Sequence, residues 1–118
     1  MSSTKLNHLF LDNVELTEEA WKDLKHIDGS VLPQVIKAIN KVAANPEPAN
    51  EGGHGHPLRN TDNSKLAGFY KIKLSKAGIR IVYQTVFKKN KILVIIIAAR
   101  ADDYVYKEAE RRIQKGLK

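Results

Sequence analysis

The spacing of apolar residues changes halfway along the chain, and this change limits the folds that the sequence can adopt. Between Thr17 and Asn45 apolar residues recur every three or four positions, which is the period of an amphipathic helix. From Phe69 to Phe87 they mostly alternate with polar residues, which is the period of a half-buried strand. Helices and strands that occupy separate stretches of one chain are typical of the α+β class.

The first half predicts an opening strand and a helical hairpin. We expect the strand near residues 8–13, around the apolar run Leu9-Phe10-Leu11. Thr17 is placed to cap a first helix, which breaks at residues 28–30, and a second helix then runs to Asn45. The residues expected on the buried faces are Ala20, Trp21, Leu24 and Ile27 in the first helix and Leu32, Val35, Ile36, Ile39, Val42 and Ala43 in the second.

The second half predicts a loop, three strands and a short helix. Residues 46–68 hold three of the four prolines and four of the seven glycines, so we expect a long loop there. Strands are expected over residues 69–74, 79–87 and 92–99. The last strand is apolar on both faces, as a covered central strand is, and Asp102 or Asp103 is expected to cap the final helix. The expectation is one α+β domain over residues 1–118: an N-terminal strand, a helical hairpin, a three-stranded antiparallel meander and a short C-terminal helix.

Charge is divided unevenly along the 118 residues, whose net charge is +7. Residues 1–57 carry five lysines and eight acids, whereas residues 58–118 carry fifteen basic residues and five acids. Between Asn63 and Ala101 there are nine basic residues and no acid. This segregation fits a polyanion partner, nucleic acid first, and it equally fits a solvated face that keeps the protein soluble.

Several classes of protein are excluded by composition. The chain has no cysteine, which rules out disulfides, thiolate zinc sites, iron–sulfur clusters and cysteine nucleophiles. Its longest apolar run has eight residues, far fewer than the roughly 20 that a membrane span needs. The first residues lack the apolar core of a signal peptide. We therefore expect a soluble cytoplasmic protein that does not contact a membrane.

Four cations and a tyrosine are expected at one edge of the sheet. Strand alternation places Lys71 and Lys73 on one face, and a hairpin partner brings Arg80 to that face. Arg100 follows the next strand, and Tyr106 lies six residues further on. Gathered cations lower the pKa of a lysine, arginines clamp phosphate, and a tyrosine stacks on a base or shares in proton transfer. Catalysis, polyanion binding and a plain solvated face all remain open at this point.

The pair His54 and His56 is the only metal-like pattern. Two histidines in a glycine-rich loop, without cysteine or an evident third ligand, are too few for a metal site. The sequence also lacks a glycine-rich phosphate loop and a recognisable Ser/His/Asp arrangement. We expect neither a metal nor a cofactor.

Three strings in the second half resemble the RelE branch of the RelE/ParE toxins, which belong to type II toxin–antitoxin systems. They are Tyr-Lys-Ile-Lys-Leu at residues 70–74, Arg-Ile-Val-Tyr-Gln at residues 80–84 and Val-Tyr-Lys-Glu-Ala-Glu-Arg-Arg-Ile at residues 105–113. The predicted hairpin and opening strand fit the same family, so the resemblance covers nearly the whole chain. It implies a RelE-like fold and cleavage of mRNA in the ribosomal A site, by attack of a ribose 2′-hydroxyl on its own 3′ phosphate without metal.

The resemblance also implies roles for five residues. Lys71 and Lys73 match the two strand lysines that hold the phosphate, one of which helps to activate the 2′-hydroxyl. Arg80 matches the arginine that stabilises charge on the transition-state phosphorane. Arg100 matches the arginine that protonates or stabilises the leaving 5′ oxygen. Tyr106 matches the tyrosine that orients the base or nucleotide.

The implied partners are mRNA, the ribosome and a small, partly disordered cognate antitoxin that covers or distorts the basic site. Two alternatives stay open. The ParE branch shares the fold but poisons gyrase and generally lacks this set of five residues, and a plain RNA-binding module would have the basic face without the chemistry.

The chain departs from the family pattern in two places. The loop before Tyr70 looks longer than usual, so a basic residue often found there cannot be placed on Arg59. Asp102 and Asp103 put two anions beside Arg100, where we expect them to repel phosphate, slow cleavage or alter docking on the ribosome.

Overall fold

The computed structural model describes residues 9–45, 56–57, 68–86 and 91–116. The strands are β1 (Val14–Leu16), β2 (His56–Pro57), β3 (Phe69–Leu74), β4 (Ile79–Val86) and β5 (Lys91–Ala98), and the helices are α2 (Glu18–Lys25), α3 (Leu32–Ala44) and α4 (Asp102–Lys115). The strands form one sheet in the order β1-β5-β4-β3-β2. β1 runs parallel to β5, and the other three neighbouring pairs are antiparallel. The α+β class and the antiparallel meander β3-β4-β5 are therefore confirmed.

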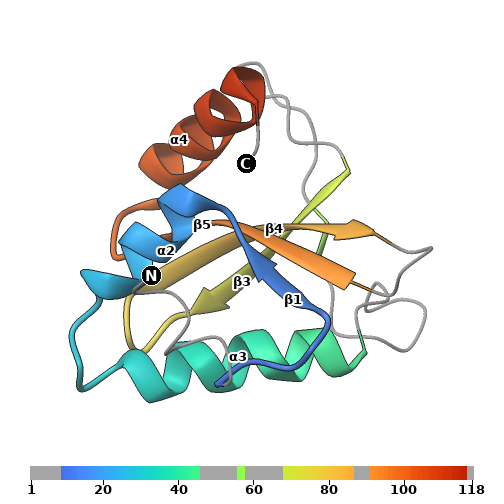
Figure 1. Cartoon of the computed structure of the whole chain (residues 1–118). Helices are drawn as coiled ribbons and strands as arrows, with labels where there is room; N and C mark the ends of the chain where they lie inside the picture. The colour runs from blue at the N-terminus through green and yellow to red at the C-terminus, as the bar shows by residue number, and fades with distance from the viewer. Residues whose placement is uncertain (1–8, 46–55, 58–67, 87–90, 117–118) are drawn as a thin grey trace.

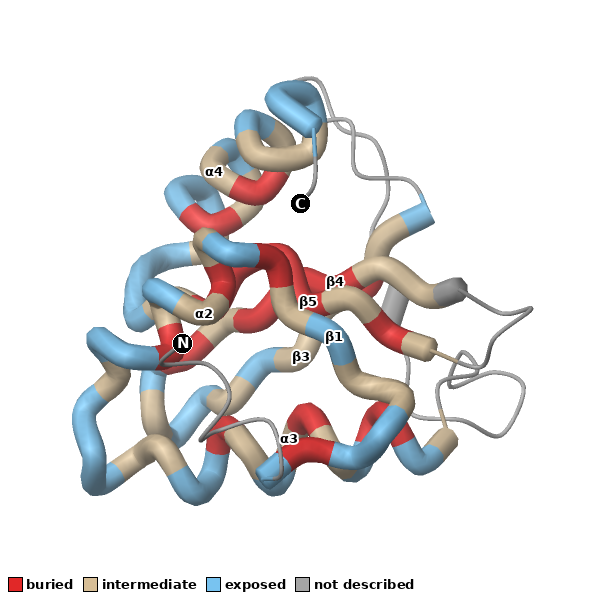
Figure 2. Tube along the Cα trace, viewed as in Figure 1, coloured by how far each residue is buried: buried red, intermediate tan, exposed pale blue. Residues whose placement is uncertain are grey.

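The helices lie on both sides of the sheet, with α3 against one face and α4 against the other (Figure 1). The face toward α3 carries the larger apolar cluster, in which Ile81 and Tyr83 of β4 pack with Val35 and Ile39 of α3. The face toward α4 carries a smaller one, formed by Val82, Ile96, Val105 and Ala109. The central strands β4 and β5 are buried along most of their length (Figure 2). No helix in the described part of the chain is long and apolar enough to cross a membrane.

The helical hairpin matches the prediction closely. The Thr17 side chain accepts a hydrogen bond from the Ala20 backbone N–H at 3.1 Å and so caps α2. The Asp28 carboxylate accepts from both the backbone and the hydroxyl of Ser30 in the predicted break. All the apolar residues expected on the buried faces are buried or partly buried: Ala20, Trp21, Leu24, Ile27, Leu32, Val35, Ile36, Ile39, Val42 and Ala43.

The opening strand was predicted too early in the chain. It is β1, three residues long, and the described residues before it form a turn. Asn40 of α3 holds this turn, because its amide accepts from the Leu11 N–H and donates to the Leu9 carbonyl. Phe10 is buried there, and its ring lies edge-on to Trp21 at 6.0 Å. The apolar run Leu9-Phe10-Leu11 is therefore held by hydrogen bonds to Asn40 and by the contact between Phe10 and Trp21, and not by pairing with another strand.

Three smaller expectations also need correction. The two-residue strand β2 lies inside the stretch predicted as a loop, and it pairs with β3. Neither Asp102 nor Asp103 caps α4, whose N-cap is Ala101 without a side-chain hydrogen bond. The final helix is not short, since its 14 residues exceed the 13 of α3. The predicted turn at residues 88–90 lies outside the described residues.

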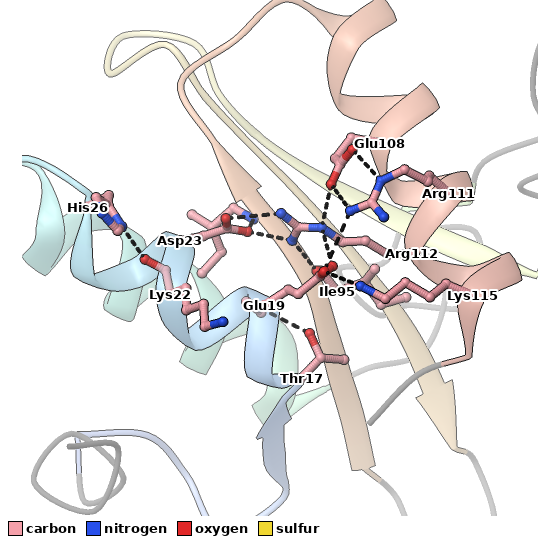
Figure 3. Close-up of polar contacts among 12 residues, drawn as sticks. Thr17, Glu19, Lys22, Asp23, His26, Ile95, Glu108, Arg111, Arg112 and Lys115 are labelled. Atoms are coloured by element: carbon pink, nitrogen blue, oxygen red, sulfur yellow. Dashed lines mark hydrogen bonds and ion pairs between the residues drawn. The ribbon is translucent and has the colours of Figure 1, made fainter. Parts of the chain in front are cut away.

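Arg112 joins α4 to α2 and to β5 (Figure 3). Its guanidinium contacts the carboxylates of Asp23 at 2.7 Å, Glu19 at 2.9 Å and Glu108 at 2.9 Å. It also donates to the Ile95 carbonyl at 2.8 Å. Ile95 lies at a register shift, where the pairing with β4 jumps from Ile96 to Val94. Arg112 therefore donates a hydrogen bond to the backbone at the irregular point of β5.

The other cations at the end of α4 are paired as well. Arg111 contacts Glu108 at 2.7 Å, and Lys115 contacts Glu19 at 2.9 Å. Part of the positive charge of the second half is therefore balanced by acids of α2 and of α4 itself. The cations of β3 and β4 lie elsewhere, on the sheet.

Glu108 provides a pH test of this network. The hydrogen bond from Arg111 is the main cause that holds its pKa at about 2 instead of 4.5, with Arg112 adding to it and burial opposing it. A carboxylate with a lowered pKa stabilises the fold above pH 4.5, and this stabilisation is lost as the pH falls toward 2. We expect Glu108→Gln to lower the urea midpoint at pH 7 and the difference from the wild type to shrink as the pH falls through this range. A difference that does not change with pH would contradict the assignment.

Candidate nucleic-acid interface

Three cations of β3 and β4 share one face of the sheet. Lys73 lies opposite Arg80 and Lys71 opposite Val82 in the antiparallel register. Val82 belongs to the apolar cluster under α4, so this is the face that α4 covers. The predicted shared face of the cations is thus confirmed, and the start of α4 lies at its edge because Arg80 pairs with Ala98 near the end of β5.

Asp102 lies among these cations. Its Oδ1 accepts a hydrogen bond from Arg80 Nε at 2.7 Å, and the two side chains are 41% and 20% exposed. This hydrogen bond is the main cause that lowers the pKa of Asp102, burial opposes it, and the charges of Lys73, Arg80 and Lys71 lower it further. This contact was not predicted from the sequence, because no local pattern joins residues 22 positions apart.

Tyr106 lies on the same side of α4, one helical turn after Asp102. Its ring packs against the cluster of Val82 and Ile96, and its buried hydroxyl has no hydrogen-bond partner among the described residues. Burial is the main cause that raises its pKa, the charge of Asp102 raises it further, and Arg80 opposes the shift. The phenol therefore stays protonated at neutral pH and keeps a hydrogen to donate.

Arg100 is placed differently. Its guanidinium carbon lies 4.0 Å from the ring centre of Tyr104, a side chain that is 44% exposed. Two residues along a helix turn about 200° around its axis, so Tyr104 and Tyr106 point to opposite sides of α4. The structure gathers Lys71, Lys73, Arg80 and Tyr106 around Asp102, whereas it holds Arg100 against Tyr104, a contact that the sequence analysis did not predict.

Two sequence features cannot be placed. His54 and Arg59 lie outside the described residues, and only the backbone of His56 is described, paired with Lys71. Among the described residues no three histidine or acidic side chains gather into a possible metal site.

Comparisons with known proteins extend over most of the chain. A family model described as "ParE toxin of type II toxin-antitoxin system, parDE" matches residues 14–104. The mRNA interferase toxin RelE of Escherichia coli K12 is 30% identical over an alignment of 103 residues, which covers 85% of this chain and 95% of that protein. The mRNA interferase RelE of Shigella flexneri matches with the same identity and coverage.

Solved structures give the same family. The free E. coli RelE toxin, with two arginines replaced by alanine, superposes with a TM-score of 0.64 at 29% identity, covering 85% of this chain and 95% of that one. RelE in the intact E. coli RelBE toxin–antitoxin complex gives a TM-score of 0.59 at 26% identity, covering 75% and 95%. The chain therefore belongs to the RelE/ParE superfamily, the toxins of type II toxin–antitoxin systems.

Proposed function

We propose that this toxin is an endoribonuclease that cleaves mRNA on the ribosome and is held inactive by a cognate antitoxin. The observation that carries the proposal is the group of Lys71, Lys73 and Arg80 around a carboxylate at the start of α4. A group of cations that holds one oxyanion offers the donors that a phosphodiester needs. The relatives named mRNA interferase, with 30% identity over most of both chains, support the same activity.

The proposed chemistry uses side chains of this chain and the ribose of the mRNA, without a metal ion, on an mRNA that the ribosome presents. The ribose 2′-oxygen attacks the adjacent 3′ phosphorus, and one of Lys71 and Lys73 takes the 2′ proton. Arg80 stabilises the extra negative charge on the phosphorane, and the bond from phosphorus to the 5′ oxygen then breaks. Arg100, once it leaves Tyr104, stabilises or protonates the leaving 5′ oxygen. The products are a 2′,3′-cyclic phosphate and a 5′-hydroxyl, whose proton comes from Arg100 or, where Arg100 only stabilises the oxyanion, from solvent.

Tyr106 is proposed to orient the nucleotide. Its phenol stays protonated near Arg80 and Asp102, and its hydroxyl, buried in this structure, would turn outward to donate a hydrogen bond to phosphate or sugar. The antitoxin is proposed to act by covering this face, and the complex of E. coli RelE with its antitoxin supports such a partner. Action on ribosomes would place the toxin in the cytoplasm.

A second candidate function is inhibition of DNA gyrase, because the matching family model is described as a ParE toxin. The experiment that separates the candidates maps the 5′ ends of a reporter mRNA in a translating extract and in an extract whose initiation is blocked. The nuclease predicts breaks in phase with codons that disappear when translation is blocked. Intact mRNA together with gyrase-linked DNA breaks would establish the second candidate, and intact mRNA that is merely retained would indicate an RNA-binding module.

A further inference from the structure

We propose that Asp102 is a positioning residue, which fixes the guanidinium of Arg80 through Nε and leaves its two terminal amino groups directed to the phosphate. The inference rests on the proposed function and adds a residue to it. It also revises the expectation that Asp102 and Asp103 repel phosphate, because it gives Asp102 a positioning role and Asp103 no role in cleavage.

The hydrogen bonds of Arg80 carry the argument. Within the described part of the chain, its side chain makes one ion pair, from Nε to Asp102 Oδ1 at 2.7 Å. Arg112 shows the contrast, because its Nε and both terminal nitrogens are engaged by carboxylates. Every nitrogen of the Arg112 guanidinium is therefore bound within the fold, whereas among the described residues the terminal nitrogens of Arg80 keep the pair of donors that binds phosphate in a bidentate manner.

Both partners stand on rigid elements. Arg80 lies within β4, which is paired on both sides, and Asp102 lies in the first turn of α4, where the helix dipole favours an acid. A free arginine side chain loses much rotational freedom when it binds a ligand. The hydrogen bond to Asp102 restricts the Arg80 side chain before phosphate binds, so less rotational freedom is lost on binding.

The charges around Asp102 also allow the opposite role, in which its carboxylate inhibits cleavage. The test must distinguish this role from positioning. Lys71, Lys73 and Arg80 act on the carboxylate, and so it also competes with phosphate for the same cations. Positioning predicts that removal of the carboxylate weakens cleavage, whereas competition predicts that it strengthens cleavage. Asp103 is the matched control, since it is the adjacent exposed acid in the same helical turn.

The first test is single-turnover cleavage on programmed ribosomes with Asp102→Ala, Asp102→Asn and Asp103→Ala. We expect Asp102→Ala to lower the maximal single-turnover rate by about 10- to 100-fold, with a smaller change in the toxin concentration that gives half of that rate; residues that orient the ligands of a metal site show effects of this size. Asp102→Asn, whose amide oxygen can still accept from Nε, should restore part of the rate, and Asp103→Ala should match the wild type. Faster cleavage by Asp102→Ala, or equal rates for the two alanine variants, would overturn the proposal.

The second test does not depend on cleavage. In ¹⁵N NMR spectra of arginine side chains, the Nε–H signal of Arg80 should be protected from exchange in the wild type and in Asp103→Ala, and lose this protection in Asp102→Ala. Titration with inorganic phosphate should then move this signal at a lower phosphate concentration in the wild type than in Asp102→Ala.

The outcomes distinguish the two proposals. If the wild type cleaves no RNA but these differences appear, the proposed nuclease activity is wrong and the positioning role stands. If Asp102→Ala folds and binds phosphate as well as the wild type does, the positioning role is wrong. Should that variant fail to fold, Asp102→Asn takes its place in both measurements, with a smaller effect in the same direction.

Discussion

Arg80→Ala is expected to lower the rate of mRNA cleavage on programmed ribosomes by about 10²- to 10³-fold, the usual cost of removing one donor to transition-state charge. Arg80 lies opposite Lys73 in the sheet and beside Asp102, so its loss removes a cation from the centre of the group. The effect should appear in the single-turnover rate at saturating toxin. Asp102 would lose its partner, but it is 41% exposed, so water can solvate it and the fold should survive.

Lys76→Ala is the matched control for this variant. It also removes one positive charge, but from the exposed turn between β3 and β4. If the basic face acts only through its overall field, the two variants should lose similar activity. Retained activity in Lys76→Ala beside lost activity in Arg80→Ala is the result that the proposed site requires.

Arg112→Ala is expected to destabilise the fold by about 2–4 kcal/mol, since it leaves the partly buried carboxylate of Asp23 without its counter-ion. The Arg112 side chain is only 11% exposed and contacts Glu19, Asp23 and Glu108. The Ile95 carbonyl would lose its donor as well. Urea unfolding followed by circular dichroism at pH 7 measures the change.

Arg111→Ala is the control that tests whether the loss of stability expected in Arg112→Ala depends on the burial of Arg112. Arg111 is the next residue, carries the same charge and contacts Glu108 and Glu19, but its side chain is 51% exposed. Exposed ion pairs contribute about 0–1 kcal/mol. Equal losses of stability in the two variants would show that Arg112 acts as a surface charge and that the junction of α2, α4 and β5 depends on other contacts.

The alternation in residues 70–74 and 79–83 was sufficient to predict which face carries the cations. Successive strand residues point to opposite sides, so the apolar residues of β3 and β4 determine where Lys71, Lys73 and Arg80 must lie. The capped helix at Thr17 was predictable for a similar reason, because its signal spans only a few residues.

Contacts between distant segments could not be predicted in this way. Arg112 and Asp23 are 89 positions apart, and Arg80 and Asp102 are 22 apart, so no periodic pattern links either pair. Asp102 looked like a helix cap because it stands at a helix start, but Ala101 takes the N-cap position. Phe10 looked like part of a strand because an apolar run does not distinguish a sheet partner from an aromatic anchor.

The central claim is that the cations around Asp102 bind a phosphate of the mRNA while the 2′-hydroxyl of the adjacent ribose attacks that phosphate. The most direct test is a reporter mRNA with a single 2′-deoxynucleotide at a mapped cleavage position, presented to the toxin on programmed ribosomes. We predict that cleavage stops at that position and continues at unmodified positions, where the fragments end in 2′,3′-cyclic phosphate. Cleavage at the 2′-deoxynucleotide itself would contradict this account, because the nucleophile would then be something other than the ribose.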